Sequence, residues 1–356
     1  TAIHVFDAHN SAKPDTITFS GNIGSTIPVD VITIGSTSRG GDAIFSGNVS
    51  AQLNIIGGNH LDEDNQADMD GDLTGTVTLD DNVGTSTLKF TGTTAQEMIG
   101  AIIANQDGEG ALSTANTAGV VTFDAIGTDA AKLLTTTIAA SNEAIFGGAV
   151  AANTFTVNGT ATLQAAANES EVFAMGANSI LYIDKTLTNG NTVISEVATT
   201  RPTLTSGAKI YMPENLSDGQ TLVLFAEEAD NSLADDADTL TEANAAIQDT
   251  ALIDYVATAV TTGTGSNLVT ANAKAEATTA TELSVTANQA RALKQALTSA
   301  ISDTTVDGTA EDAFNNALNG VNGLTALDDT NLAQQVAPQT DLISGSSVAA
   351  QSVTGS

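Results

Sequence analysis

The chain has 356 residues, no cysteine, and 42 acidic residues against 10 basic ones, which gives a formal net charge of −32. A polyanion is repelled by phosphate backbones and by anionic lipid surfaces, so this charge excludes nucleic acid as a partner and argues against membrane binding. Without cysteine there are no disulfides and no thiolate metal sites. No apolar run reaches the length of a transmembrane helix, so we expect no direct membrane insertion. The first residues, Thr1 to Phe6, lack the basic and apolar regions of a signal peptide, so an exported protein would be processed from a longer precursor.

Residues 1 to about 225 contain an irregular repeat of an apolar residue, any residue, Phe, a small polar residue, Gly and another apolar residue. It occurs as Ile17-Thr-Phe19-Ser-Gly21-Asn-Ile23 and as Ile44-Phe45-Ser-Gly47-Asn-Val49, with looser copies around Phe90, Phe123 and Phe146. The step from Phe19 to Phe45 is 26 residues, and the step from Phe123 to Phe146 is 23. Repeats of this length are typical of solenoids, and β-branched residues alternating between Gly and Asn turns favour strands.

The repeat therefore predicts an all-β fold, a parallel β-solenoid in which each unit forms one coil. We expect the Phe side chains to stack on equivalent positions of neighbouring coils, and Gly and Asn to occupy the corners, where left-handed backbone angles are needed. The alternative is a β-sandwich in which the Phe spacing is coincidental.

Two acidic segments interrupt the repeat, near 60–72 and 227–242, and we expect both to be loops or insertions that leave the solenoid. The first contains Asp68, Asp70 and Asp72 around Gly71, an oxygen-rich pattern suited to a hard cation. These three residues are the candidate calcium ligands, and calcium is the only cofactor that we expect. The other interpretation is a solvated acidic loop, and the segment from Glu227 to Asp238 is a weaker candidate.

From residue 283 the pattern changes to helical spacing. Apolar residues recur at helical intervals over 286–301, 309–318 and 328–336, and Ser284 or Thr286 is placed to cap the first helix. We therefore divide the chain into a solenoid over 1–282 and a helical cap with a polar tail over 283–356. A helical cap would cover the exposed terminal edge of the solenoid.

The C-terminal third resembles the end of an autotransporter (type V secretion) passenger domain of the large surface-antigen type. The resemblance covers roughly residues 205–340 and is carried by Asp218-Gly-Gln-Thr-Leu-Val-Leu-Phe225, by the paired segments around Leu252-Ile-Asp-Tyr255 and Asn267-Leu-Val269, and by the junction segments Leu283-Ser-Val-Thr-Ala-Asn-Gln289 and Leu332-Ala-Gln-Gln-Val-Ala-Pro338. It implies a right-handed parallel β-helix at the bacterial cell surface or outside the cell. The family continues into a membrane β-barrel, whereas this sequence stops at Ser356, so the resemblance implies a passenger separated from its translocator.

The sequence offers little that favours catalysis. The three histidines are His4, His9 and His60, and we expect them to be exposed or at an interface. No nucleophile elbow, zinc-binding His pair or phosphate-binding loop is present. We therefore predict a protein that is not an enzyme, with a polysaccharide-degrading β-helix as the least favoured alternative.

These observations predict an extracellular structural surface protein that self-assembles with other copies of itself into a coat or filament. The strand expected at Ile3 to Phe6 precedes the repeat and is suited to pairing with another copy. The alternative is a surface adhesin that binds a receptor or a glycan through an exposed patch.

Overall fold

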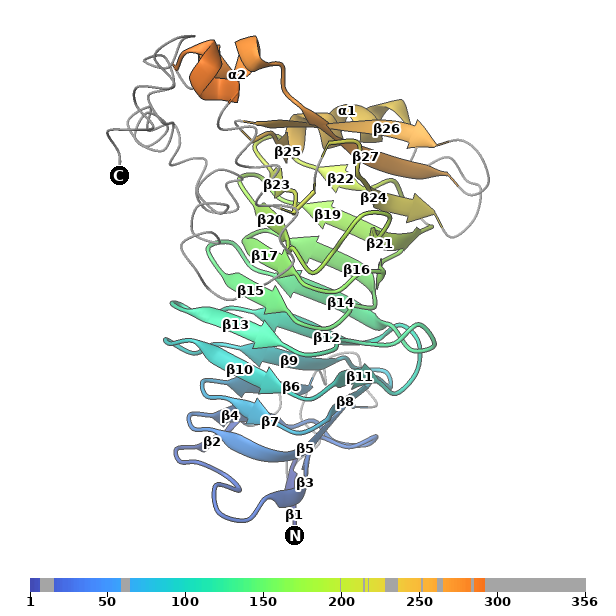
Figure 1. Cartoon of the computed structure of the whole chain (residues 1–356). Helices are drawn as coiled ribbons and strands as arrows, with labels where there is room; N and C mark the ends of the chain where they lie inside the picture. The colour runs from blue at the N-terminus through green and yellow to red at the C-terminus, as the bar shows by residue number, and fades with distance from the viewer. Residues whose placement is uncertain are drawn as a thin grey trace, which may run out of the picture.

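The computed structural model describes residues 1–6, 16–58, 65–198, 200–213, 215–216, 218–227, 236–250, 252–260, 265–282 and 285–291. The chain forms a stack of parallel β-strands, with the first strand at one end and the two helices at the other (Figure 1). The predicted parallel β-solenoid is confirmed. Within the described residues, no helix has the length and apolar character needed to cross a membrane.

The strands belong to three hydrogen-bonded sheets. The nine-stranded sheet consists of β2 (Thr16–Phe19), β4 (Asp42–Phe45), β6 (Asn65–Met69), β9 (Ser86–Phe90), β12 (Glu109–Thr114), β14 (Leu133–Ile138), β16 (Ala152–Val157), β19 (Val172–Met175) and β22 (Thr203–Leu204). The 13-stranded sheet consists of β1 (Ala2–Val5), β3 (Val29–Ile34), β5 (Val49–Ile56), β7 (Leu73–Thr74), β8 (Val77–Asp80), β10 (Gln96–Ile99), β11 (Ile102–Ala104), β13 (Val120–Phe123), β15 (Glu143–Phe146), β17 (Thr160–Leu163), β20 (Ile180–Ile183), β23 (Lys209–Tyr211) and β25 (Ile247–Gln248). The five-stranded sheet consists of β18 (Asn168–Glu169), β21 (Thr192–Val197), β24 (Thr221–Glu227), β27 (Ser266–Ala273) and β26 (Ile253–Val260).

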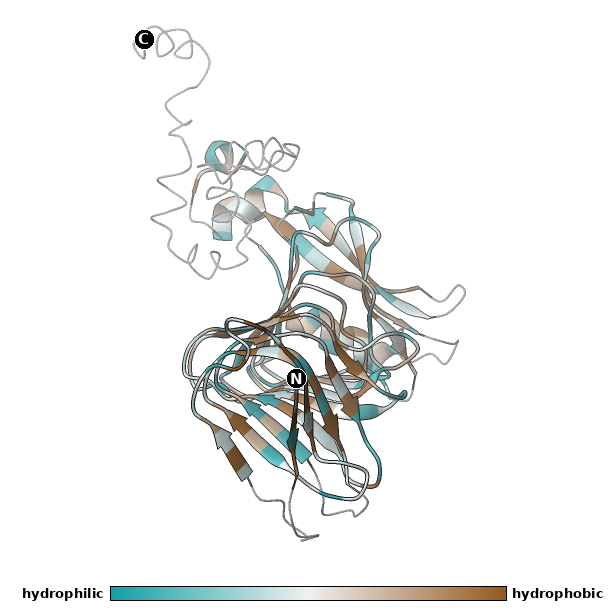
Figure 2. Cartoon of the chain, turned by 90° about the horizontal axis from the view of Figure 1, so that it is seen from below, coloured by the Kyte–Doolittle hydropathy of each residue, from teal (hydrophilic) through white to brown (hydrophobic). Residues whose placement is uncertain are grey.

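The sheets form three sides around a shared interior, which Figure 2 shows from the N-terminal end. The 13-stranded sheet covers two of the sides because β5 turns a corner, pairing first with β7 and then with β8. Single bridges at Ile126 and Val150, and then the bridge from Ala151 to Glu169, connect the side of β11 to the five-stranded sheet. One circuit through the three sides is a coil.

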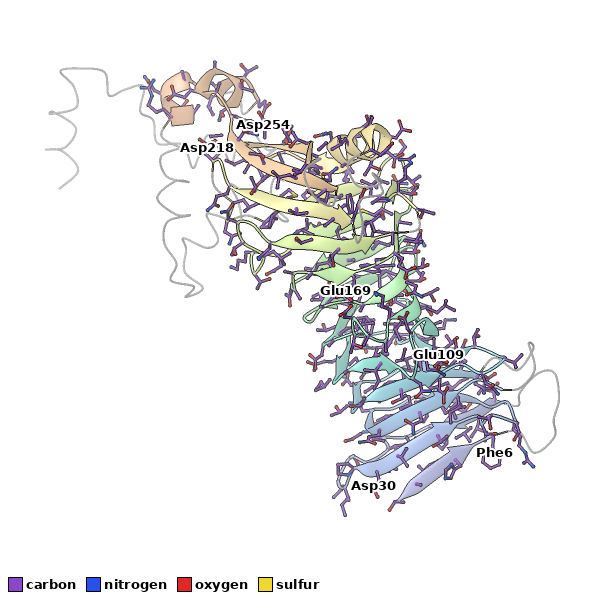
Figure 3. All side chains as sticks on the ribbon, turned by 90° about the vertical axis from the view of Figure 1, so that its right-hand side faces the viewer. Phe6, Asp30, Glu109, Glu169, Asp218 and Asp254 are labelled. Atoms are coloured by element: carbon purple, nitrogen blue, oxygen red, sulfur yellow. The ribbon has the colours of Figure 1, made fainter. Side chains whose placement is uncertain are left out.

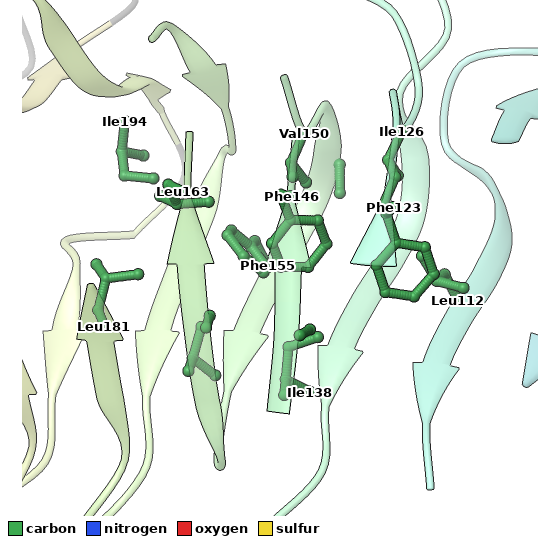
Figure 4. Packing of buried hydrophobic residues seen from close by; sticks show 14 of the residues in the cluster. Leu112, Phe123, Ile126, Ile138, Phe146, Val150, Phe155, Leu163, Leu181 and Ile194 are labelled. Atoms are coloured by element: carbon green, nitrogen blue, oxygen red, sulfur yellow. The ribbon is translucent and has the colours of Figure 1, made fainter. Parts of the chain in front are cut away.

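The interior is one hydrophobic cluster that runs from Val5 to Ala271. Strand residues alternate between buried and half-buried positions because successive side chains point to opposite faces of a sheet. Figure 4 shows Phe123, Phe146 and Phe155 inside the stack among aliphatic side chains. The alternation gives each coil an apolar inner face and a polar outer face.

The predicted Phe stacking is confirmed for two pairs, and the other Phe pairs have a different ring geometry. Phe19 stacks on Phe45 with ring centroids 5.1 Å apart, and Phe123 stacks on Phe146 at 5.4 Å. The other contacts are edge-to-face or tilted. Phe155 and Phe173 are register partners on one sheet, whereas the contacts Phe90–Phe123, Phe146–Phe155 and Phe173–Phe225 cross between sides and complete one continuous run. Phe residues from different sides face one another across the narrow interior, so they form a run instead of a single column.

At the C-terminal end, a hairpin and two helices come before the helical region that we predicted from residue 283. Parallel pairing ends with β24 and β25, and β26 and β27 then form an antiparallel hairpin on the edge of β24. The helices α1 (Ala237–Ala246) and α2 (Glu276–Glu282) both precede residue 283. The coils therefore end before the predicted boundary at residue 282, and the cap combines a hairpin with helices.

Both of these helices are absent from the sequence-based prediction. Asp236 is the N-cap of α1, because it accepts hydrogen bonds from the backbone N–H groups of Asp238 and Thr239. The helix was missed because the many acidic residues of 227–242 were interpreted as a solvated loop. The helix α2 is seven residues long and rich in Thr, which has low helix propensity. The predicted cap at Thr286 is confirmed: its hydroxyl accepts from the Gln289 N–H, and the Gln289 side chain accepts from the Thr286 N–H. The rest of the predicted helices, the tail and Ser284 lie outside the described residues.

Candidate functional site

The three candidate calcium ligands lie in and just after β6, between β4 and β9 in the nine-stranded sheet. The predicted loop is therefore wrong for residues 65–72, which form a regular strand and corner of one coil. Residues 59–64 lie outside the described part of the chain, as do 228–235 in the second acidic segment. In the remainder of that second segment, Glu227 ends β24 and Asp236 caps the helix α1, which packs against β22 and β26.

Each of the three carboxylates has its own partners in this coil. Asp68 faces outward, accepts a hydrogen bond from the Gln66 amide at 2.6 Å, and is the register partner of Lys89. Asp70 accepts from the Thr91 hydroxyl at 2.7 Å. Asp72 accepts from the Asn48 amide at 3.0 Å and from the Glu97 backbone N–H at 2.9 Å.

Asp72 belongs to a column of side chains that joins the corners of successive coils. The side-chain Oδ1 of Asn22 accepts from the Asn48 backbone N–H at 2.9 Å, and the side-chain Oδ1 of Asn48 accepts from the Asp72 backbone N–H at 3.1 Å. The segment Met69-Asp-Gly-Asp72 therefore occupies the same corner as Phe45-Ser-Gly-Asn48 in the preceding coil. The spacing of Gly71 from Gly47 is the sequence signal that would have identified it.

The structure therefore distributes the three carboxylates along a strand and a corner. Across the described ranges, no three His, Asp or Glu side chains are grouped so that they would hold a metal ion. Calcium binding stays a prediction, and the corner geometry supplies a structural role for Asp72 that needs no cation.

The corner column predicts different outcomes for two substitutions at Asp72. Asp72→Asn keeps an acceptor for the Glu97 N–H and loses only the exposed acceptor for the Asn48 amide, so we expect the free energy of unfolding to change by less than about 0.5 kcal/mol. Asp72→Ala leaves the Glu97 N–H and the Asn48 amide without this partner, so we expect a loss of about 1–2 kcal/mol. Urea unfolding with and without calcium measures both. A calcium-dependent rise in stability that Asp72→Asn abolishes would assign Asp72 to a cation site instead.

Acidic side chains occur along the whole length of the stack, and Figure 3 labels Asp30 near one end and Asp254 near the other. Burial is the largest cause that raises the pKa of Asp68, Glu109 and Asp249 above their ordinary values. A nearby carboxylate adds to the rise in each case, namely Asp70 for Asp68, Asp80 for Glu109 and Asp254 for Asp249. These three groups are therefore more readily protonated in the folded chain than in the unfolded chain.

This shift predicts that the folded state gains stability on mild acidification. A carboxyl whose folded pKa lies above its unfolded value stabilises the fold fully below the unfolded value, and this contribution disappears as the pH rises through the folded pKa. Self-repulsion at a net charge of −32 also weakens as carboxylates become protonated. We expect the melting temperature to rise as the pH falls from 7 toward 5, measured by circular dichroism at constant ionic strength. A melting temperature that falls over this range would contradict the prediction.

The N-terminal end of the stack exposes apolar side chains of the core. Within the described residues, β1 pairs only with β3 and β2 pairs only with β4. Ile17 occupies the inward column of the nine-stranded sheet, in register with the buried Ala43, yet it is 41% exposed because the described residues place no coil beneath it. Ile27 is 79% exposed and Phe6 is 45% exposed at the same end. We call these three side chains, with Ile3 and Phe19, the N-terminal end face.

At the C-terminal end, side chains occupy the edge of the outermost strand, β26. The Asn244 amide of α1 donates to the Ala257 carbonyl at 3.0 Å and accepts from the Ala257 N–H at 2.9 Å, as a neighbouring strand would. Asp249 accepts from the Tyr255 N–H at 2.8 Å. Lys274 is buried and forms ion pairs with Asp254 and Glu282 at 3.4 and 2.7 Å. Asn244 and Asp249 therefore occupy part of the outer edge of β26, at Tyr255 and Ala257, which disfavours the addition of a further strand there.

Of the three histidines, the structure describes only His4. His4 lies in β1 and is exposed, whereas His9 and His60 lie outside the described residues. Comparison of the chain with family models, with curated proteins and with solved structures gives no match in any of the three.

Proposed function

We propose that the protein is an extracellular structural surface protein whose copies associate through the N-terminal end face. The observation that carries this proposal is the difference between the two ends of the stack. Within the described residues, the N-terminal coil has open strand edges and exposed apolar side chains, whereas at the C-terminal end Asn244 and Asp249 engage the edge of β26.

An open sheet edge flanked by exposed apolar side chains favours pairing with another chain. The N-terminal end face combines both features in a chain whose self-repulsion otherwise disfavours association. Two identical end faces can meet about a two-fold axis, which gives a closed pair. A coat or a filament then needs a second contact elsewhere on the surface.

The resemblance to an autotransporter passenger supports the extracellular location. Its segments around Leu222, Tyr255 and Leu268 lie on the strands β24, β26 and β27, which belong to one sheet. The absence of cysteine and the acidic surface agree with a secreted structural protein, because such a surface keeps the chain soluble without disulfides.

The proposal predicts that charge on the N-terminal end face prevents association. In sedimentation velocity experiments over a range of protein concentrations, we expect the unmodified chain to form dimers or larger species. Ile27→Lys should keep it monomeric because a Lys on the end face must be desolvated on pairing. Ile17→Lys tests the inward column, with circular dichroism to confirm that the first coil stays folded.

Val83→Lys is the matched control, because Val83 is 48% exposed and lies away from the N-terminal coil. This variant should associate like the unmodified chain. A chain that is monomeric at every concentration would overturn the proposal and favour the adhesin alternative. If both Ile variants associated like the unmodified chain, the contact between copies would lie on another surface.

A further inference from the structure

Two of the three tyrosines form a stacked pair on the outside of the solenoid. Tyr182 in β20 and Tyr211 in β23 are direct register partners on parallel strands. Their ring centroids are 5.0 Å apart and the ring planes differ by 22°. Both side chains are half-buried on the outer face, between the inward-facing residues Leu181 and Ile183 on one strand and beside Ile210 on the other.

The pair is isolated from other aromatic rungs on this face. The register partner of Tyr182 in the preceding coil is Thr162, and the partner of Tyr211 in the following strand is Gln248. Burial raises the pKa of the Tyr182 phenol above its ordinary value, and the charges of Tyr211 and Glu143 add to the rise. The phenol is therefore protonated at neutral pH, so its oxidation releases a proton together with an electron.

The rest of the chain offers few competing sites for an oxidant. It contains no Cys and no Trp. The four methionines, Met69, Met98, Met175 and Met212, are all buried. The third tyrosine, Tyr255, is only 4% exposed. The stacked phenols are therefore the accessible, readily oxidised side chains of the described structure, and they are already in contact.

We propose that Tyr182 and Tyr211 form an intramolecular dityrosine bond under one-electron oxidation by a peroxidase and hydrogen peroxide. Each phenol loses one electron and one proton to give a phenoxyl radical. The two radicals couple through the ring carbons beside the hydroxyl groups, and the hydrogens on those carbons move to the oxygens as the rings become aromatic again. In total, two electrons and two protons leave the protein, and one molecule of hydrogen peroxide is reduced to two molecules of water. The half-exposed rings have solvent on one side and can tilt to bring those carbons together.

The bond ties two successive coils beside the C-terminal cap. It closes a loop between residues 182 and 211, and such a closure lowers the conformational entropy of the unfolded chain in the way that a disulfide does. In a chain without thiols, it supplies a covalent connection that reducing agents do not break.

The experiment treats the dilute full-length chain with hydrogen peroxide and a haem peroxidase. We expect dityrosine fluorescence in the monomer fraction, an intact mass lower by two hydrogen atoms, and a cross-linked peptide that contains residues 182 and 211. Tyr182→Phe and Tyr211→Phe keep the stacked rings but remove one phenol, so each should lose the product. Tyr255→Phe should keep it, with circular dichroism to confirm that this variant is folded. The oxidised monomer should unfold at a higher urea concentration than the untreated chain.

Three results would overturn the proposal. The first is dityrosine that persists in the Tyr182→Phe monomer. The second is a product confined to covalent multimers, which would make it a contact between copies. The third is an equal yield from the urea-unfolded chain, because the stacked geometry would then contribute nothing.

Discussion

Phe155→Ala is expected to reduce the free energy of unfolding by about 3–5 kcal/mol, the usual result of deleting a buried ring from a packed core. Phe155 is fully buried in β16 and joins two stretches of the Phe run, with ring centroids 5.6 Å from both Phe146 and Phe173. A coil contacts mainly its neighbours, so the loss should be largest around β14, β16 and β19. Urea unfolding gives the magnitude, and amide hydrogen exchange locates it.

Phe6→Ala is the matched control because it removes the same atoms from a ring that is 45% exposed. The Arg39 guanidinium lies 5.6 Å from the centre of the Phe6 ring, so a loss of about 0.5–1 kcal/mol is expected from that cation–π contact. Equal losses at Phe155 and Phe6 would show that the Phe run does not carry the stability of the stack.

Gly75→Ala is expected to reduce the free energy of unfolding by about 2–5 kcal/mol, through backbone strain and steric overlap together. Gly75 has φ +142° at the corner between β7 and β8, where a Cβ would overlap the Ala51 carbonyl of the preceding coil. That carbonyl belongs to the backbone, so relief would require the two coils to move apart. Thermal and urea unfolding measure the loss.

Two other glycines separate the two causes. Gly219 has φ +80° but nothing within 4 Å of an added Cβ, so Gly219→Ala should cost only the strain, about 1 kcal/mol. Gly21 has neither feature, and Gly21→Ala should change the stability by less than about 0.5 kcal/mol. If all three variants had the same stability, close stacking of the corners would not be the source of the effect at Gly75.

The amino-acid sequence was sufficient to predict the solenoid and the kinds of residue at its corners. Phe, β-branched residues and Gly-Asn turns repeat at intervals that favour stacked strands, and alternation within each strand separates the inner face from the outer face. The structure bears this out in the Phe19–Phe45 stack and in the column of Asn22 and Asn48. These features depend on residues close together in the chain and on a recurring motif, and a single sequence displays both.

Features that depend on how coils stack could be decided only by the tertiary structure. The coils differ in length: Val157 pairs with Met175 after 18 residues, whereas Met175 pairs with Leu204 after 29. The register between coils therefore follows from packing and cannot be counted along the chain. This is why the contact between Tyr182 and Tyr211, which lie 29 residues apart on neighbouring coils, was not predicted. The antiparallel hairpin that ends the stack also depends on tertiary structure, because β27 pairs with an edge of β24 that exists only once the coils have formed.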